Sequence, residues 1–149
     1  MTDVWDYPEP FLMDFKASEE HIDGLQHVNN GVYVNWCQDV GWAHSVFLGL
    51  DMKAYHELDR AMVIRHSEYD YRAAAYLDEP LRAATWLTGS DDRLTMERRF
   101  QLMRISDGAV LLRARWQLVC IEISSGRPRR MPEVFKRLYG PAVIDVDAV

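Results

Sequence analysis

The stretch HIDGLQHVNNGVYVNW, residues 21–36, decides how the rest of the chain is interpreted. It opens with a polar segment that holds Asp23, His27, Asn29 and Asn30, and a helical pattern of apolar residues starts at Gly31. Polar residues directly before a helix are typical of turns and helix caps. The sequence therefore predicts a polar loop that leads into the first turn of a helix.

The predicted helix covers Gly31 to Leu48, where apolar residues recur at three- and four-residue spacing. Its apolar face is expected to hold Tyr33, Trp36, Cys37, Val40, Phe47 and Leu48, and the opposite face Asn35, Gln38, Asp39 and Ser45. Trp42 and Val46 interrupt the polar face, so we expect that face to contact a ligand or another subunit.

The remaining pattern predicts a sheet. A first strand is expected at Phe11 to Ala17, a turn or short helix at Asp51 to Arg60, and a short helix at Pro132 to Tyr139. Four longer strands are expected at Ala61 to Tyr71, Leu81 to Thr88, Arg93 to Ile105 and Ala109 to Ile123. The short turn-like separators favour an antiparallel meander. The fold class is therefore α+β, with one long helix wrapped by a five-stranded antiparallel sheet.

The length of the chain and its net charge indicate a single domain that does not bind nucleic acid. The chain has 149 residues with 23 acidic and 17 basic side chains, a net charge of −6, which disfavours nucleic acid as a partner. We expect one domain over residues 1–149, with an irregular lead-in at 1–10 and a C-terminal tail at 141–149 that frays from Asp145 to Val149. Without a membrane-spanning segment or a secretory leader, the expected location is cytoplasmic. Cys37 and Cys120 lack the spacing of a zinc site.

The polar loop also has the parts of an acyl-transfer site. Backbone N–H groups in a helix's first turn favour negative charge, so those of Asn30 or Gly31 could polarise a carbonyl and stabilise an oxyanion. Asp23 could attack that carbonyl or activate a water beside it. The same residues would also occur in a purely structural turn and cap, so spacing alone leaves both interpretations open.

The pattern Asp-x-x-Gln-His-Val-Asn-Asn-x-x-Tyr-x-x-Trp, from Asp23 to Trp36, resembles the signature of hotdog-fold acyl thioesterases. These include the 4-hydroxybenzoyl-CoA thioesterase group and the acyl-acyl-carrier-protein thioesterases. The wider order of elements resembles the hotdog fold from about Phe11 to Tyr139. The resemblance implies hydrolysis of acyl-CoA or acyl-carrier-protein thioesters without metal or organic cofactor, by dimers or tetramers with active sites at the subunit interface.

Carried over by position, the resemblance implies that Asp23 is the catalytic carboxylate and that His27 belongs to the site. The backbone of Asn30 and Gly31 would polarise the thioester carbonyl. Where the plant enzymes have an asparagine two residues after the aspartate, this chain has Leu25, so the simpler set of an aspartate and an oxyanion hole fits better. Candidate substrate contacts are Asn29, Tyr33 and the basic run Arg127, Arg129 and Arg130.

Several alternatives remain open. The chain could be a non-catalytic hotdog protein that binds an acyl ligand, or a hydratase or dehydratase that acts on acyl thioesters. The spacing of His21, Asp23 and His27 matches no established metal pattern. We expect His44 and Cys37 to be core residues. Arg98, which interrupts an apolar strand face, is either a salt-bridge partner or a polar group inside a binding cleft.

Overall fold

The computed structural model describes residues 4–148 of the chain. Every predicted helix and strand is present, with ends within two residues of those expected. The strands are β1 (Phe11–Lys16), β2 (Arg60–Tyr71), β3 (Pro80–Ser90), β4 (Thr95–Arg104) and β5 (Val110–Glu122). The helices are α1 (Asn30–Phe47), α2 (Met52–Leu58) and α3 (Glu133–Tyr139), with 3₁₀ turns at Glu19–His21, Gly140–Ala142 and Val146–Ala148. No helix among these residues is long and apolar enough to cross a membrane.

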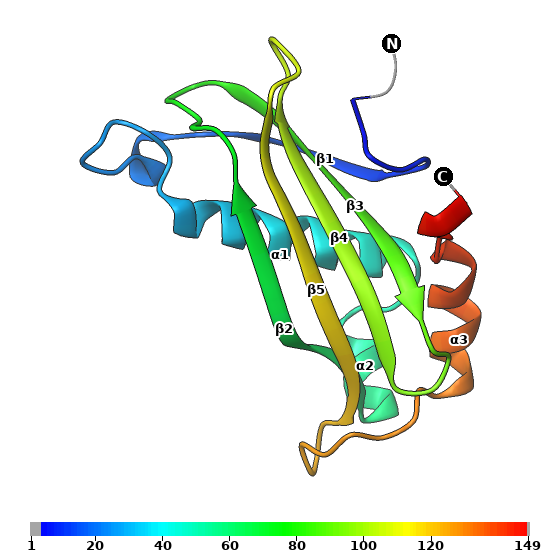
Figure 1. Cartoon of the computed structure of the whole chain (residues 1–149). Helices are drawn as coiled ribbons and strands as arrows, with labels where there is room; N and C mark the ends of the chain where they lie inside the picture. The colour runs from blue at the N-terminus through cyan, green and yellow to red at the C-terminus, as the bar shows by residue number, and fades with distance from the viewer. Residues whose placement is uncertain (1–3, 149) are drawn as a thin grey trace.

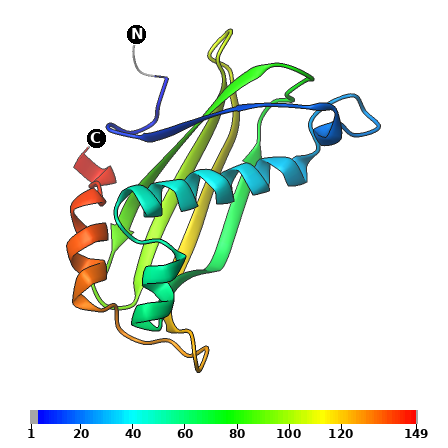
Figure 2. The ribbon, with the colours of Figure 1, turned by 180° about the vertical axis from the view of Figure 1, so that it is seen from behind.

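The five strands form one antiparallel sheet in the order β1-β3-β4-β5-β2, and α1 crosses one face of it (Figures 1 and 2). The sheet curves around the helix because strands twist, so the predicted helix wrapped by a sheet is confirmed. Val40 of α1 is fully buried, and Phe100 and Leu112 of the sheet line the same part of the core.

The expected meander is wrong for its first strand. β3, β4 and β5 follow one another as hairpins, but β2 pairs with β5 at the far edge of the sheet instead of with β3. The reason is that β1 already occupies the free side of β3, where Phe11 lies opposite Thr85. Residues 72–79 therefore cross from one edge of the sheet to the other (Figure 1).

Two residues of α1 lie on the opposite side from that predicted. Phe47 is 74% exposed and lies beside Phe11 of the edge strand β1, 5.5 Å between ring centroids, whereas Ser45 is buried. Ser45 is covered because α2 and α3 pack on its face: its hydroxyl donates to Leu50 O at 2.7 Å and pairs with the hydroxyl of Tyr139. Trp42 and Val46 are exposed, as expected.

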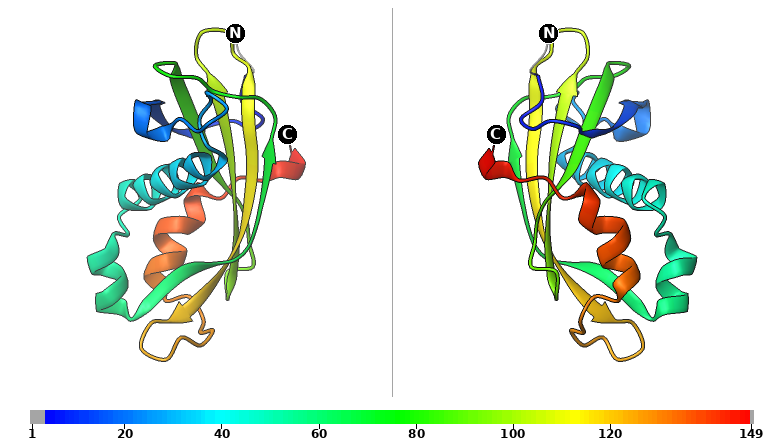
Figure 3. Two further views of the ribbon diagram at one scale, coloured as in Figure 1. Left: turned by 90° about the vertical axis from the view of Figure 1, so that its left-hand side faces the viewer. Right: turned by 90° about the vertical axis from the view of Figure 1, so that its right-hand side faces the viewer.

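Segments near both ends of the described residues 4–148 bond to the sheet, which Figure 3 shows edge-on with α1 on one side. Residues 4–10 form no helix or strand, yet Val4 O accepts a hydrogen bond from Gln101, and Pro8 O accepts one from Trp86. Val143, in the expected C-terminal tail, pairs with Leu87, since the edge of β3 beyond β1 offers unpaired backbone groups.

Candidate functional site

The loop before α1 is a small hairpin with a fixed backbone. Ile22 and Val28 form an antiparallel bridge, and the backbone N–H of Asp23 donates to His27 O at 2.9 Å. At the tip, Gln26 adopts a φ of +68°, in the left-handed region that closes such a turn. The hairpin that carries Asp23 leads directly into the start of α1 (Figure 2).

Asp23 has a half-buried side chain with one oxygen engaged. Its Oδ1 accepts a hydrogen bond from the backbone N–H of Leu25 at 2.9 Å, an Asx turn that fixes the orientation of the carboxylate. Within residues 4–148, the other oxygen, Oδ2, accepts no hydrogen bond. One carboxylate oxygen is thus available to a ligand or a water.

The first turn of α1 is capped by Asn29, whose Oδ1 accepts from Gly31 N–H at 2.8 Å. Val32 N–H donates to Asn29 O at 2.9 Å. Asn29 therefore serves as the helix cap, and its cap occupies the Gly31 donor that was predicted to polarise a carbonyl. Among the described residues, the backbone N–H of Asn30 has no acceptor, so it is the donor of this turn that remains free for a ligand.

The two histidines of the loop have different surroundings. The ring of His27 is half-buried and lies edge-on to the exposed ring of Tyr76, 5.8 Å between centroids. His21 is a structural residue, because its Nδ1 accepts from Ser18 N–H at 3.0 Å and its ring packs edge-on against Trp36. Across residues 4–148, His, Cys, Asp and Glu side chains form no group of three that could hold a metal ion.

Tyr33, a predicted substrate contact, lies in the core of the protomer. It is 1% exposed, its hydroxyl donates to Ala73 O at 3.1 Å, and its ring stacks on Tyr71. Burial raises the pKa of this hydroxyl. The side chain therefore secures the end of β2 against α1, and nothing in this arrangement exposes it to a ligand.

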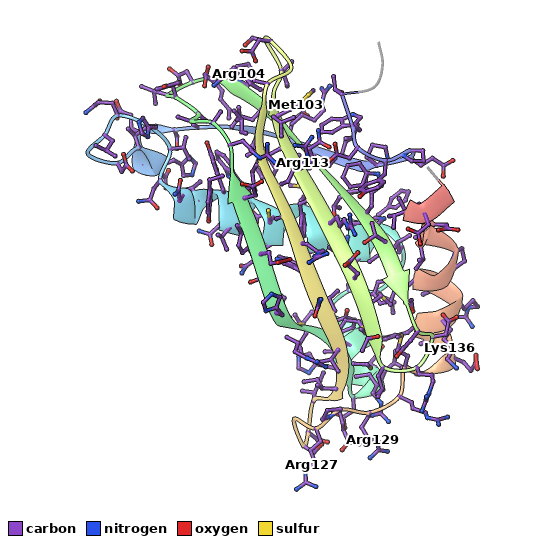
Figure 4. The ribbon with its side chains drawn as sticks, viewed as in Figure 1. Met103, Arg104, Arg113, Arg127, Arg129 and Lys136 are labelled. Carbon is purple, nitrogen blue, oxygen red and sulfur yellow. The ribbon has the colours of Figure 1, made fainter. Side chains whose placement is uncertain are left out.

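The basic run lies at the opposite end of the protomer, so one chain does not bring it together with Asp23. Arg127 and Arg129 project from the loop after β5, at the bottom of Figure 4. Ser124 of this loop bonds to Asp59, the residue before the start of β2, whereas Tyr33 stacks on Tyr71, the last residue of β2. The 12 residues of β2 separate the two ends by about 36 Å.

A cavity that no sequence motif located lies beneath the middle of α1. It has a volume of about 390 Å³, and Arg98 is among the residues that line it. The sequence signal for this cavity was Arg98, a charged residue within the apolar face of β4. No carboxylate among residues 4–148 forms an ion pair with it. The expectation of a polar group inside a cleft fits this position; the salt-bridge alternative does not.

One family profile matches the part of the chain that contains the hairpin, α1 and every strand of the sheet except β1. The sequence profile of the thioesterase-like superfamily matches residues 18–138, from the turn before Asp23 through most of α3. The chain belongs to the thioesterase-like superfamily. Comparison with the curated proteins finds no match.

Solved structures show that this member of the thioesterase-like superfamily has the hotdog fold. A 1,4-dihydroxy-2-naphthoyl-CoA thioesterase from Synechocystis aligns with a TM-score of 0.79 at 16% identity, over 89% of this chain and 96% of its own. A Staphylococcus aureus protein in complex with CoA gives 0.82 at 17% identity, over 91% and 87%. The 12:0-ACP thioesterase from Umbellularia californica gives 0.81 at 18% identity, over 91% of this chain and 51% of the plant chain.

Proposed function

We propose that the protein hydrolyses an acyl thioester of CoA or of an acyl carrier protein to the free acid and the thiol. The observation that carries the proposal is that one short hairpin carries Asp23, with one carboxylate oxygen that accepts no hydrogen bond from residues 4–148, and leads into the unpaired Asn30 N–H at the start of α1. Membership of the thioesterase-like superfamily supports thioester hydrolysis as the class of reaction.

In the proposed reaction, the thioester carbonyl oxygen accepts a hydrogen bond from Asn30 N–H, and the positive end of the α1 dipole favours the charge that develops on it. Asp23 acts on the carbonyl carbon in one of two ways. As a general base it takes a proton from a water that attacks the carbon; as a nucleophile it forms an anhydride that water then hydrolyses. Both routes consume one water and release a carboxylic acid and a thiol.

His27 is proposed to border the substrate at the tip of the hairpin, where its half-buried ring packs on Tyr76. Asn29 contributes indirectly, because its cap fixes the first turn of α1 and thereby the direction of the Asn30 N–H. The proposed catalytic set is therefore Asp23 with the backbone of Asn30, supported by His27 and Asn29.

The proposed active unit is a homodimer that pairs two copies of β2. β2 is an edge strand of 12 residues, and an unpaired edge of this length is a template for another strand. A two-fold axis at its middle reverses the strand, and so carries the loop after β5 of the second copy toward the hairpin of the first. In that arrangement Arg127, Arg129 and Arg130 could engage the phosphates of CoA or an acidic carrier protein.

The test is release of free thiol from short, medium, long and aromatic acyl-CoAs, followed by the corresponding acyl carrier proteins. Turnover of at least one class by the wild-type chain is expected, and Gly24→Ala should match it because a Cβ there would meet no atom within 4 Å. If neither carrier is hydrolysed while an acyl ligand still binds, the function is ligand binding without catalysis. Release of water from a hydroxyacyl thioester, without thiol, would instead indicate a dehydratase.

A further inference from the structure

The cavity beneath α1 is separate from the hairpin and is not used by the proposed reaction. It lies between α1, α2, β2 and the inner face of the sheet, with a volume of about 390 Å³. Cavities of this size are typical of small-molecule sites. Its walls are mainly apolar and include Trp42, Met62, Ile64, Met96, Trp116 and Leu118.

One charged side chain, that of Arg98, lines this apolar cavity. Arg98 is 4% exposed, and its Nη1 donates to Nδ1 of His44 at 2.8 Å and to Oγ1 of Thr85 at 3.1 Å. Within residues 4–148, its Nε and Nη2 donate to no protein atom and no carboxylate lies within ion-pair distance. Two of the three guanidinium nitrogens are therefore available to a ligand.

Every polar group around Arg98 is neutral. Burial and the guanidinium lower the pKa of His44 to about 3, so the imidazole is uncharged at neutral pH. Burial raises the pKa of Tyr55 and of Tyr139, so both phenols are protonated. Burial also lowers the pKa of Arg98 to about 10, which still leaves it charged at neutral pH.

Other arginines of the sheet are arranged differently. Arg99, the next residue, pairs with Glu97 at 3.0 Å; Arg104 pairs with Glu79 at 2.9 Å; and Arg113 pairs with Asp6 at 2.7 Å. A buried charge without a counter-ion is costly to fold, so it is expected where an external anion completes the pair.

The helix above is built to accommodate the guanidinium. A Cβ on Gly41 would lie 3.3 Å from Cζ3 of Trp116 and 3.4 Å from Cδ of Arg98. Glycine at this position lets α1 approach the sheet without filling the cavity or displacing Arg98. Gly41 therefore preserves both the cavity and the position of the charged Arg98 side chain.

We propose that this cavity binds an amphiphile with an apolar body and a terminal carboxylate, and that Arg98 pairs with that carboxylate. The apolar body lies against Trp42, Met62 and Trp116. Two sources have this chemistry: a free carboxylic acid, or an acyl thioester that bears a second carboxylate at its far end. The proposal does not rest on hydrolysis at Asp23.

Binding is tested at pH 7 with octanoate and 1-octanol, by calorimetry and by the fluorescence of the tryptophans that line the cavity. Octanoate should bind and 1-octanol should bind at least about tenfold more weakly, since a hydrogen bond between charged groups is lost. Arg98→Met should weaken octanoate binding by about tenfold or more, Arg98→Lys should recover part of the loss, and Arg115→Met on the outer face should change nothing.

Two further measurements test the proposal if Arg98→Met does not fold and distinguish the two sources of the carboxylate. Met62→Trp fills the cavity without removing the buried charge and should also abolish octanoate binding, which covers the case in which Arg98→Met fails to fold. Omega-carboxyoctanoyl-CoA, compared with octanoyl-CoA in the same titrations, identifies the thioester source if it alone binds in an Arg98-dependent way. Equal binding of octanoate and 1-octanol, or no Arg98-dependent binding of either carboxylate, overturns the proposal.

Discussion

The side-chain oxygen of Asn29 lies 2.8 Å from the backbone nitrogen of Gly31 and accepts its hydrogen. This cap satisfies one of the four N–H groups that a helix start leaves unpaired, and so it fixes the orientation of the neighbouring Asn30 N–H. The cap and the proposed oxyanion donor are thus adjacent parts of one helix start, and they can be separated by substitution.

Asn29→Asp should preserve the fold and impair turnover. Aspartate caps a helix about as well as asparagine, so the free energy of unfolding should change by less than about 0.5 kcal/mol. The added negative charge would lie beside the oxyanion that develops at Asn30 N–H, so kcat should fall about tenfold or more. Urea unfolding and thiol release measure the two effects. An unchanged kcat would contradict the placement of the developing charge at this helix start.

His44 makes stability depend on pH in a definite direction. Its folded pKa of about 3 is below the usual value of 6.5, so between these pH values the unfolded chain binds a proton that the folded chain does not. The contribution of neutral His44 to the free energy of unfolding is therefore complete above pH 6.5, and it is lost as the pH falls toward 3. The free energy of unfolding should therefore decrease by up to about 1.4 kcal/mol per pH unit on acidification.

The matched variant for this effect is His44→Gln, which retains an acceptor for Arg98 but does not titrate. Urea unfolding at pH 7 and pH 5 should show a shallower loss of stability for this variant than for the wild type. Parallel pH profiles for the two proteins would show that His44 takes up its proton in the folded state and would refute its assignment as a neutral core residue.

The sequence predicted the elements better than their arrangement. Periodicity placed α1 and the strands because local burial repeats every two residues in a strand and at three- and four-residue intervals in a helix. Pairing of β2 with β5 has no local signal, since it depends on β1 having taken the edge of β3. The exposure of Phe47 likewise depends on its neighbour in the fold, Phe11 of the edge strand β1.

The residues of the candidate site likewise fall into two groups: those that a local motif locates and those whose place depends on the fold. The hairpin with Asp23, His27 and Asn29 is contiguous in sequence, so a motif could locate it. Tyr33 shares helical spacing with the core, and burial decided its place. Arg127 carries no sequence signal for its separation from Asp23, because that separation depends on the pairing of β2 with β5, which is set by the fold.

Dimer formation through β2 is tested by two side chains of equal exposure. Ile64 on β2 and Leu12 on β1, the opposite edge strand, are each 42% exposed. The wild-type chain should be a dimer by light scattering at micromolar concentration. Ile64→Asp should shift it to monomer and lower turnover, while Leu12→Asp should leave it a dimer. A monomeric wild type that turns over substrate would refute the interface proposal.

The most direct test of the central proposal is the kcat of Asp23→Asn on the best thioester substrate of the wild type, with substrate binding measured in parallel. Asparagine still accepts the hydrogen bond from Leu25 N–H, so the hairpin and the affinity for substrate should be retained. The carboxylate that attacks or activates water is gone, so kcat should fall by at least about a hundredfold. A folded Asp23→Asn protein with wild-type kcat would contradict the assignment of Asp23 as the catalytic carboxylate.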